Sequence, residues 1–509
     1  MGQTEKARFI AEVTFNPLQD NLRLIQFTLN PLARIKEVMD SEGNKLSFVG
    51  KYINRTHLPD FWVLLNQPGK KGKTEKIIVV YELGIQNFVS GGTWYPAWKM
   101  VVDKHTVNLR VRMRRGLNIK AVGERVDEFL SGNYKVSEWR SKGPVPIYGF
   151  TIAKKFREKR VTIKNVPEVI SFCGSNARTT NNMVKNVAID VANSLSFYSS
   201  IFGIKLPYKN IWVTAIESGH GQAFQGFLHL SQFTYDSEHP GASELFRAHE
   251  AAHLYWGHLV GWKSYRDQWL SEAFSEYSAM LYIQAVMPKK KHFANILQAY
   301  KDELMGSVKV MFSKYVRPMK IFKRNMDKIG PISVGIRSSV ADAPFGYEMQ
   351  TYHKGPLVLH MIRMMLRNTK GNNQLFITIL KDFLHTYKGK DASTADFRRM
   401  IEKYTRQDWS WFFNQWVHGT AIPTYKWNYK DSKRDKVTGK YKLVINVSQS
   451  NVPEGFKMPV PVRVIFKDRT VRQFALPIAK KEQSFNLAFD KKIKKVIFNP
   501  GHAVLARVK

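Results

Sequence analysis

The chain has 509 residues, of which 44% are hydrophobic and 13% aromatic, a composition that fits two to four globular domains and argues against disorder. Lys and Arg number 79 against 41 Asp and Glu, and the formal net charge of +38 will attract anionic surfaces non-specifically. No RNA- or DNA-binding motif accompanies these cations, so we interpret them as a solvated coat and expect no specific nucleic acid partner. The single cysteine, Cys173, excludes an internal disulfide.

Residues 1–176 are predicted to form β-structure. Short alternating or β-branched runs, separated by Gly, Pro, Asn or Asp, occur at 11–15, 22–29, 61–65, 76–83 and 106–113. No stretch reaches eighteen apolar residues, so we expect no transmembrane segment.

Residues 177–423 change to helical spacing of apolar positions, as in 181–203, 243–262, 267–287 and 355–368. Residues 424–509 return to strand patterns, whose number and spacing predict a small β-sandwich. The predicted order is therefore β, then mostly α, then β.

The segment RAHEAAHLYWGH, residues 247–258, carries His249 and His253 four residues apart, with Glu250 directly after the first histidine. Residues four apart lie on one face of a helix, so both imidazoles can bind one metal ion while Glu250 acts on a water molecule. The alternative is a pair of interfacial histidines on an ordinary amphipathic helix.

A catalytic zinc site needs three protein ligands and one open position. Glu272 follows His253 after eighteen intervening residues, on the next predicted helix, where a turn between the helices lets it face the two histidines. Glu276, one helical turn later, could orient a ligand histidine or be an exposed carboxylate. The spacing thus predicts one zinc ion per chain, bound by His249, His253 and Glu272.

The zinc-site segment, 249–277, closely resembles that of the zinc aminopeptidases of the gluzincin clan, which include alanyl aminopeptidases and the leukotriene hydrolase. The segment YHKGPLVLHMIRMML, 352–366, is similar to the family's Tyr-x-Lys-Gly stretch. By that resemblance Tyr352 stabilises the oxyanion and Tyr347 is an accessory tyrosine. The stretches 91–98, 144–156 and 410–423 also resemble family segments.

The resemblance implies a multidomain α+β fold. It comprises an N-terminal β-sheet saddle domain (1–176), a thermolysin-like, mostly helical catalytic domain (177–423) and a C-terminal β-sandwich (424–509). Glu250 would be the general base in hydrolysis of peptide substrates, most simply by removal of N-terminal residues.

The sequence departs from the family in the segment that holds the substrate's free amine. Ala223 stands where the Gly-x-Met-Glu-Asn motif has its glutamate, which leaves Glu217 and Gln222 as the nearby candidate substrate-binding residues. The usual C-terminal helical domain does not follow the sandwich, and the N-terminal domain resembles one that starts partway in. As written, without an apolar signal core, the chain would be cytoplasmic, with a periplasmic or membrane-associated location left open.

Endopeptidase-like action and ester or epoxide hydrolysis stay open as alternatives within the family. Outside it, the rival hypotheses are a non-catalytic basic scaffold and a nucleic-acid-binding protein driven by charge, which would show a steep salt dependence.

Overall fold

The computed structural model describes residues 6–509 apart from 31, 51–59, 85–93, 99–102, 175–178, 218–219, 236–240, 289–290, 307–328, 340–342, 344 and 368–370. The chain forms two compact units. The first comprises Met1–Ser199, Lys205–Tyr265 and Ser339–Pro344, and the second Ser200–Ile204, Arg266–Ser338 and Phe345–Lys509. Among the described residues, no helix combines the length and apolar character needed to cross a membrane.

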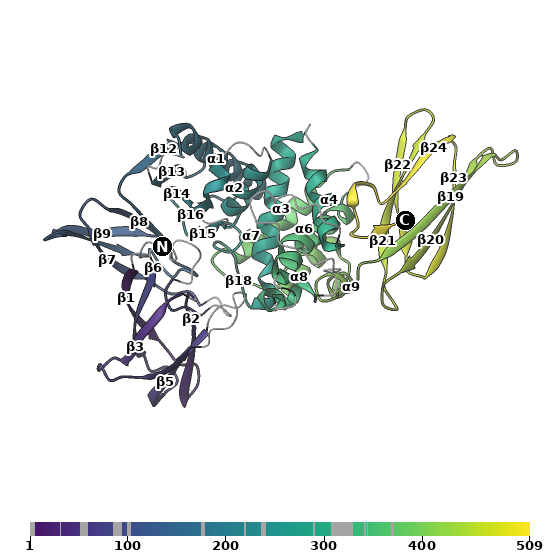
Figure 1. The fold of residues 1–509 in the computed structure, drawn as a ribbon. Coiled ribbons are helices and arrows are strands. Elements are labelled where there is room, and N and C mark those ends of the chain that lie inside the picture. The colour runs from purple at the N-terminus through teal and green to yellow at the C-terminus, as the bar shows by residue number, and fades with distance from the viewer. Residues whose placement is uncertain are drawn as a thin grey trace. The chain divides into compact units, whose positions relative to one another are not determined.

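The N-terminal part of the first unit consists of antiparallel strands (Figure 1). One three-stranded sheet has the order β1 (Lys6–Phe15), β6 (Glu75–Gly84), β3 (Arg34–Asp40), and a second has the order β2 (Leu22–Thr28), β5 (Asp60–Gly69), β4 (Ser47–Gly50). A third has the order β7 (Asn108–Arg114), β10 (Tyr134–Arg140), β9 (Glu124–Ser131), and β11 (Phe150–Ala153) pairs with β8 (Asn118–Ala121). Their inward side chains, among them Val63, Val79, Tyr81 and Phe150, form one hydrophobic core.

A mixed five-stranded sheet completes the first unit, in the order β12 (Phe156–Val161), β13 (Glu168–Gly174), β14 (Asn210–Ile216), β16 (Phe227–Ser231), β15 (Gln222–Phe224). The three central strands are parallel and β15 is an antiparallel edge strand. The unit also holds helices α1 (Asn181–Phe202) and α2 (Ala242–Ala252), the short 3-10 turn η2 (Gln232–Tyr235) and β17 (Gly261–Trp262). Helix α2 packs against β15 and β16.

Most of the helices of the second unit lie in its N-terminal part and are shown in teal and green in Figure 1. They are α3 (Trp269–Val286), α4 (His292–Leu304), α5 (Gly346–Glu348), the π-helix η7 (Met349–Lys354), α6 (Gly355–Met365), α7 (Gln374–Tyr387), α8 (Thr394–Thr405) and α9 (Ser410–Trp416). The short elements η6 (Ile332–Ser338) and β18 (Asp391–Ala392) also belong to this unit, and η3 (Tyr265–Asp267) spans the boundary. Helix α3 is buried nearly all round and packs against α4, α6 and η7, as expected for its apolar sequence.

The C-terminal strands of the second unit form two sheets. One is ordered β23 (Glu482–Phe489), β20 (Tyr441–Ser450), β19 (Thr424–Arg434), β25 (Arg507–Val508), and the other β22 (Val471–Ile478), β21 (Met458–Phe466), β24 (Ile493–Phe498), followed by η8 (Pro500–His502). Rings from the two sheets meet, with Phe466 5.4 Å from Phe489 and Tyr425 5.8 Å from Phe498. The predicted C-terminal β-sandwich thus rests on an apolar interior.

The predicted multidomain α+β organisation agrees with this architecture. The boundaries near 176 and 423, the saddle and the thermolysin-like assignment stay predictions. Of the segment 91–98, residues 91–93 lie outside the described part, whereas Trp94 is buried in the first unit's core. The predicted helix over 243–262 is shorter in the structure, because α2 ends at Ala252 and turns follow.

Candidate metal centre

Hydrogen bonds and an ion pair hold helix α2 at its N-terminus and along its buried face. The Glu244 carboxylate accepts a 2.6 Å hydrogen bond from the Gly241 N–H at the helix start, where a negative charge is favourable. Arg247 forms a 2.8 Å ion pair with Asp190 of α1, and Tyr198 of α1 donates to the Ala248 carbonyl. The face that carries the motif is therefore held by α1.

His249 and His253 lie together on this face. Although α2 ends at Ala252, His253 keeps right-handed helical dihedrals and its N–H donates to the His249 carbonyl at 3.2 Å. The two Nε2 atoms are 2.9 Å apart, and both residues are buried. The predicted i, i+4 arrangement is retained at the last residue of the helical path.

Nδ1 of His253 lies 3.0 Å from the carbonyl oxygen of Trp256. A carbonyl only accepts hydrogen bonds, so Nδ1 is the donor in this contact and Nε2 is the ring nitrogen that faces His249. Ligand histidines in metal sites have this kind of support on the ring nitrogen away from the metal.

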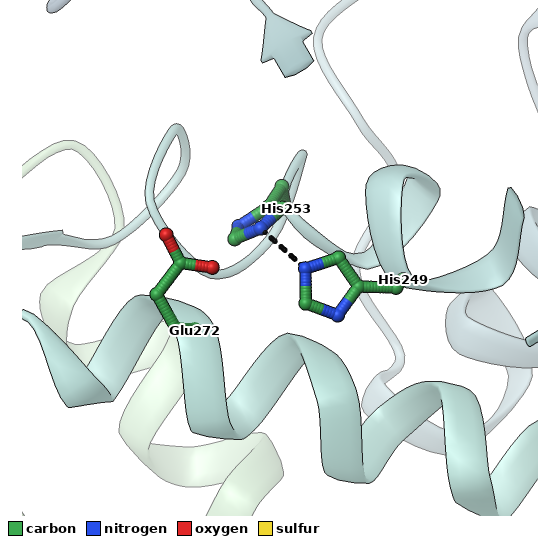
Figure 2. Close-up of side chains that lie close together, drawn as sticks. All are labelled: His249, His253 and Glu272. Atoms are coloured by element: carbon green, nitrogen blue, oxygen red, sulfur yellow. Dashed lines mark hydrogen bonds between the residues drawn. The ribbon is translucent and has the colours of Figure 1, made fainter. Parts of the chain in front are cut away.

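Glu272 is the third member of the cluster. It lies in the first turn of α3, and one ligand atom from each of His249, His253 and Glu272 lies within 4.8 Å of the others. Figure 2 shows the carboxylate and the two imidazoles turned toward one another. Two imidazole nitrogens and a carboxylate oxygen fit the donor set of a catalytic zinc site, in which the protein leaves one position open.

Glu250 is buried and closely covered by backbone. A methyl group built on Gly221 would lie 2.3 Å from Glu250 Oε1 and 2.6 Å from a ring carbon of Phe246. Only glycine fits here without displacing the carboxylate. Gly221 was not predicted as a site residue, because a glycine in a loop gives no signal of what approaches it.

Tyr347 and Tyr352 lie together in the second unit, with ring centroids 5.8 Å apart and nearly perpendicular planes. The Tyr347 hydroxyl points to Glu272 Oε1 at 3.4 Å, a long and weak hydrogen bond. Burial, together with the carboxylates of Glu272 and Glu348, raises the pKa of Tyr347 well above its usual value. Its hydroxyl is therefore protonated and can donate a hydrogen bond to the Glu272 carboxylate.

Three further predicted residues have other surroundings. Glu276 is buried and accepts a hydrogen bond from Tyr300, so its role toward a ligand histidine stays a prediction. Gln222 starts the edge strand β15 and donates to the Ala223 carbonyl at 3.3 Å. Glu217 is exposed just after β14, and Ala223 is only 1% exposed.

Comparison with known proteins shows what this chain is similar to. The chain is 19% identical to Aminopeptidase M1 of Arabidopsis thaliana over 349 residues, which cover 67% of this chain and 37% of that protein. It is 21% identical to the Alanine/arginine aminopeptidase of Saccharomyces cerevisiae, with 58% of this chain and 33% of that protein covered. Tricorn protease-interacting factor F2 of Thermoplasma volcanium is also 21% identical, over 55% of this chain and 33% of that protein.

A histidine pair with a third, carboxylate donor thus lies in a chain that is similar to proteins mostly named aminopeptidases. Residues 190–416 match the Peptidase family M1 domain, and this range includes all three cluster residues. Over this stretch the chain is therefore similar to peptidase family M1. It spans about a third of the length of the curated relatives named above.

Proposed function

We propose that the protein is a zinc-dependent metallopeptidase that removes N-terminal residues from peptides. The observation that carries this proposal is the cluster of His249, His253 and Glu272 inside the stretch matched by the Peptidase family M1 domain. Two of the three relatives described above are named as aminopeptidases, which supports exopeptidase action here.

His249, His253 and Glu272 would hold one zinc ion. Zinc supplies a Lewis acid that polarises a carbonyl and makes water a competent nucleophile near neutral pH. The hydrogen bond from His253 Nδ1 to the Trp256 carbonyl would orient the ring so that Nε2 is the nitrogen offered to the metal. The long hydrogen bond from Tyr347 would limit rotation of the Glu272 carboxylate.

Glu250 would take a proton from the attacking water and deliver it to the leaving amine. Its burial and close contact with Gly221 restrict the carboxylate to few positions, so little entropy is lost on reaction. Tyr352 would donate a hydrogen bond to the oxyanion that forms at the scissile carbonyl, an interaction worth about 3 kcal/mol in comparable sites.

Selection of the free amine requires an acceptor for the substrate's ammonium group. A cationic ammonium needs a carboxylate or several acceptors once it leaves water, and Ala223 offers no side-chain acceptor. Gln222 would contribute a neutral acceptor and Glu217 a carboxylate from an exposed position. We therefore expect weaker preference for free amines than a buried carboxylate would give.

We assign the chemistry to a thermolysin-like catalytic domain over 177–423, between an N-terminal saddle domain over 1–176 and the C-terminal sandwich over 424–509. Peptides are the proposed substrates. Endopeptidase-like action, ester or epoxide hydrolysis and a non-catalytic scaffold are the outcomes that would replace this proposal.

The deciding experiment offers the purified protein a short peptide with a free amine and the same peptide acetylated, with and without a chelator, beside a measurement of bound metal. We expect one zinc per chain, chelator-sensitive hydrolysis and a rate ratio that favours the free amine. An amine anchor of full strength would give a ratio of about a hundredfold, close to 3 kcal/mol. A ratio near one would make the protein endopeptidase-like, and metal without hydrolysis of either peptide would support the scaffold.

A further inference from the structure

The backbone that carries Tyr352 is a π-helix. In η7 the Gly355 N–H donates to the Gln350 carbonyl five residues earlier, and regular α-helix resumes only in α6. Single π-turns inside α-helices are uncommon and shift the side chains away from the regular 100° progression. Contacts to neighbouring elements must therefore fix where the tyrosine points.

His353, the residue after Tyr352, makes such a contact. Its Nε2 lies 3.1 Å from Glu303 Oε2 of α4, and both side chains are nearly buried, at 14% and 13% exposure. Burial lowers the pKa of His353 to about 4, so at neutral pH the ring is uncharged, and its one N–H faces the Glu303 carboxylate. A charge-assisted hydrogen bond then joins η7 to α4.

The contact continues to α3, the helix that carries Glu272. The ring of His353 lies 4.5 Å from the ring of Tyr300 in α4, and the Tyr300 hydroxyl donates to Glu276 of α3. Burial and the Glu276 charge raise the pKa of Tyr300 well above its usual value, which keeps the donor protonated.

A second contact ties the end of η7 to the same turn of α3. A methyl group built on Gly355 would lie 2.5 Å from Cβ of Ala273, the residue next to Glu272. The backbones approach this closely only because residue 355 is glycine. The π-helix is thus held against α3 at Gly355 and, through α4, at His353.

We propose that His353 and Glu303 are positioning residues that fix the hydroxyl of Tyr352 relative to the α3 turn that carries Glu272. Neither touches the reacting atoms. This inference rests on the proposed function, in which Tyr352 donates to the oxyanion, and it assigns the control of that donor to the nearly buried pair of His353 on η7 and Glu303 on α4.

The test is a double-mutant cycle on the full chain with metal bound. His353→Phe keeps an aromatic ring beside Tyr300 but removes the N–H to Glu303, and His353→Gln keeps a donor. We expect His353→Phe to lower kcat by about tenfold or more, with KM and zinc content little changed, and His353→Gln to recover part of the loss. In a Tyr352→Phe background, His353→Phe should cost less than about twofold further, because the hydroxyl it positions is already gone.

The control is His360→Gln, which removes two hydrogen bonds of a buried histidine in α6 without touching η7 contacts to Glu303. It should leave kcat near the parent value. Equal losses from His353→Phe in both backgrounds, or loss of zinc with kcat, would overturn the proposal by making the role merely structural.

Hydrogen exchange of residues 349–354 supplies a readout independent of hydrolysis. We expect faster exchange in this segment in His353→Phe and not in His360→Gln, and unchanged exchange would overturn the proposed contact whatever the activity. An inactive parent, or Tyr352→Phe at the parent rate, would instead overturn the proposed function of Tyr352 and with it the positioning role, while faster exchange would still report the contact.

Discussion

Helix α2 and the π-helix η7 both lie within residues 190–416, and they position their proposed site residues in different ways. On α2 the histidine pair follows from the regular helix repeat, since residues four apart share a face and the His253 N–H still bonds to the His249 carbonyl. On η7 the backbone departs from that repeat, and Tyr352 depends on His353, Glu303 and the close approach of Gly355 to α3. Residues placed by a local repeat are readable in sequence, whereas residues placed by long-range contacts are not.

This comparison predicts that substitution of a histidine of the α2 motif removes bound metal, whereas substitution of Tyr352 on η7 leaves the metal bound. The largest effect is expected for His253→Ala, which deletes a ligand on the regular helix. Bound zinc should fall from one per chain towards none and hydrolysis should fall to the chelated background, as measured by metal analysis and a peptide assay. His385→Ala, on the exposed face of α7, is the control and should change neither. Full zinc occupancy in His253→Ala would remove this residue from the ligand set.

Glu250→Gln distinguishes the proposed general base, Glu250, from the proposed metal ligand His249 beside it on α2. The amide keeps the shape of the side chain but cannot take a proton, so we expect zinc to stay bound and kcat to fall by about 10⁴-fold. Metal analysis and steady-state kinetics on one preparation check both statements. Retention of more than a tenth of the parent rate would assign the base elsewhere.

Tyr352→Phe is the corresponding change on η7. We expect kcat to fall by about a hundredfold with KM little changed, because the lost hydrogen bond forms to charge that develops in the transition state. Zinc should stay bound, in contrast to His253→Ala. A variant that hydrolyses peptides at the parent rate would place oxyanion stabilisation in another residue.

Gly221→Ala tests a long-range contact within the α2 region itself. The new methyl group would meet Glu250 Oε1 at 2.3 Å, and a shift of about 1 Å in a catalytic group can cost up to about a hundredfold in rate. We expect a fall in kcat of about tenfold or more, with zinc retained. Gly143→Ala is a matched control, since nothing lies within 4 Å of its methyl position. Equal rates for the two variants would show that Glu250 tolerates displacement.

The smallest effect concerns stability beside η7. His360 in α6 is 2% exposed; its Nε2 faces the Gly501 carbonyl at 3.1 Å, and its Nδ1 faces the Tyr277 hydroxyl at 3.0 Å. Burial lowers the pKa of His360 to about 3, so between pH 6.5 and about 3 the unfolded chain binds a proton that the folded chain does not. The stability that His360 contributes is therefore complete above pH 6.5 and is lost as the pH falls.

Denaturant unfolding between pH 7 and pH 4.5 checks this sign. The free energy of unfolding should fall less steeply with decreasing pH in His360→Gln than in the parent, by about 1.4 kcal/mol per pH unit. Parallel slopes would mean that His360 is protonated in the folded protein.

The order of the β, helical and β regions could be predicted from the amino-acid sequence alone. So could the grouping of His249 and His253 with the Glu272 carboxylate. Alternation with period two and helical spacing both act over a few residues, so they survive without knowledge of the fold. The sequence also indicated Tyr347 and Tyr352, but only through resemblance to a family. Their ring contact and the hydrogen bond from Tyr347 to Glu272 join residues up to 75 positions apart.

The tertiary structure was needed to see which ring nitrogen of His253 is available to bind a metal, because the carbonyl of Trp256 that contacts Nδ1 is a backbone group and leaves no mark in the sequence. It alone brought the backbone of Gly221 against Glu250, and it alone ended α2 at Ala252. The pairing of His353 with Glu303 across 50 residues is of the same kind. The contacts of Gly221 with Glu250 and of His353 with Glu303 depend on the packing of distant segments, which no local pattern of residue types records. The contact of His253 with Trp256 is local but depends on where the helix ends.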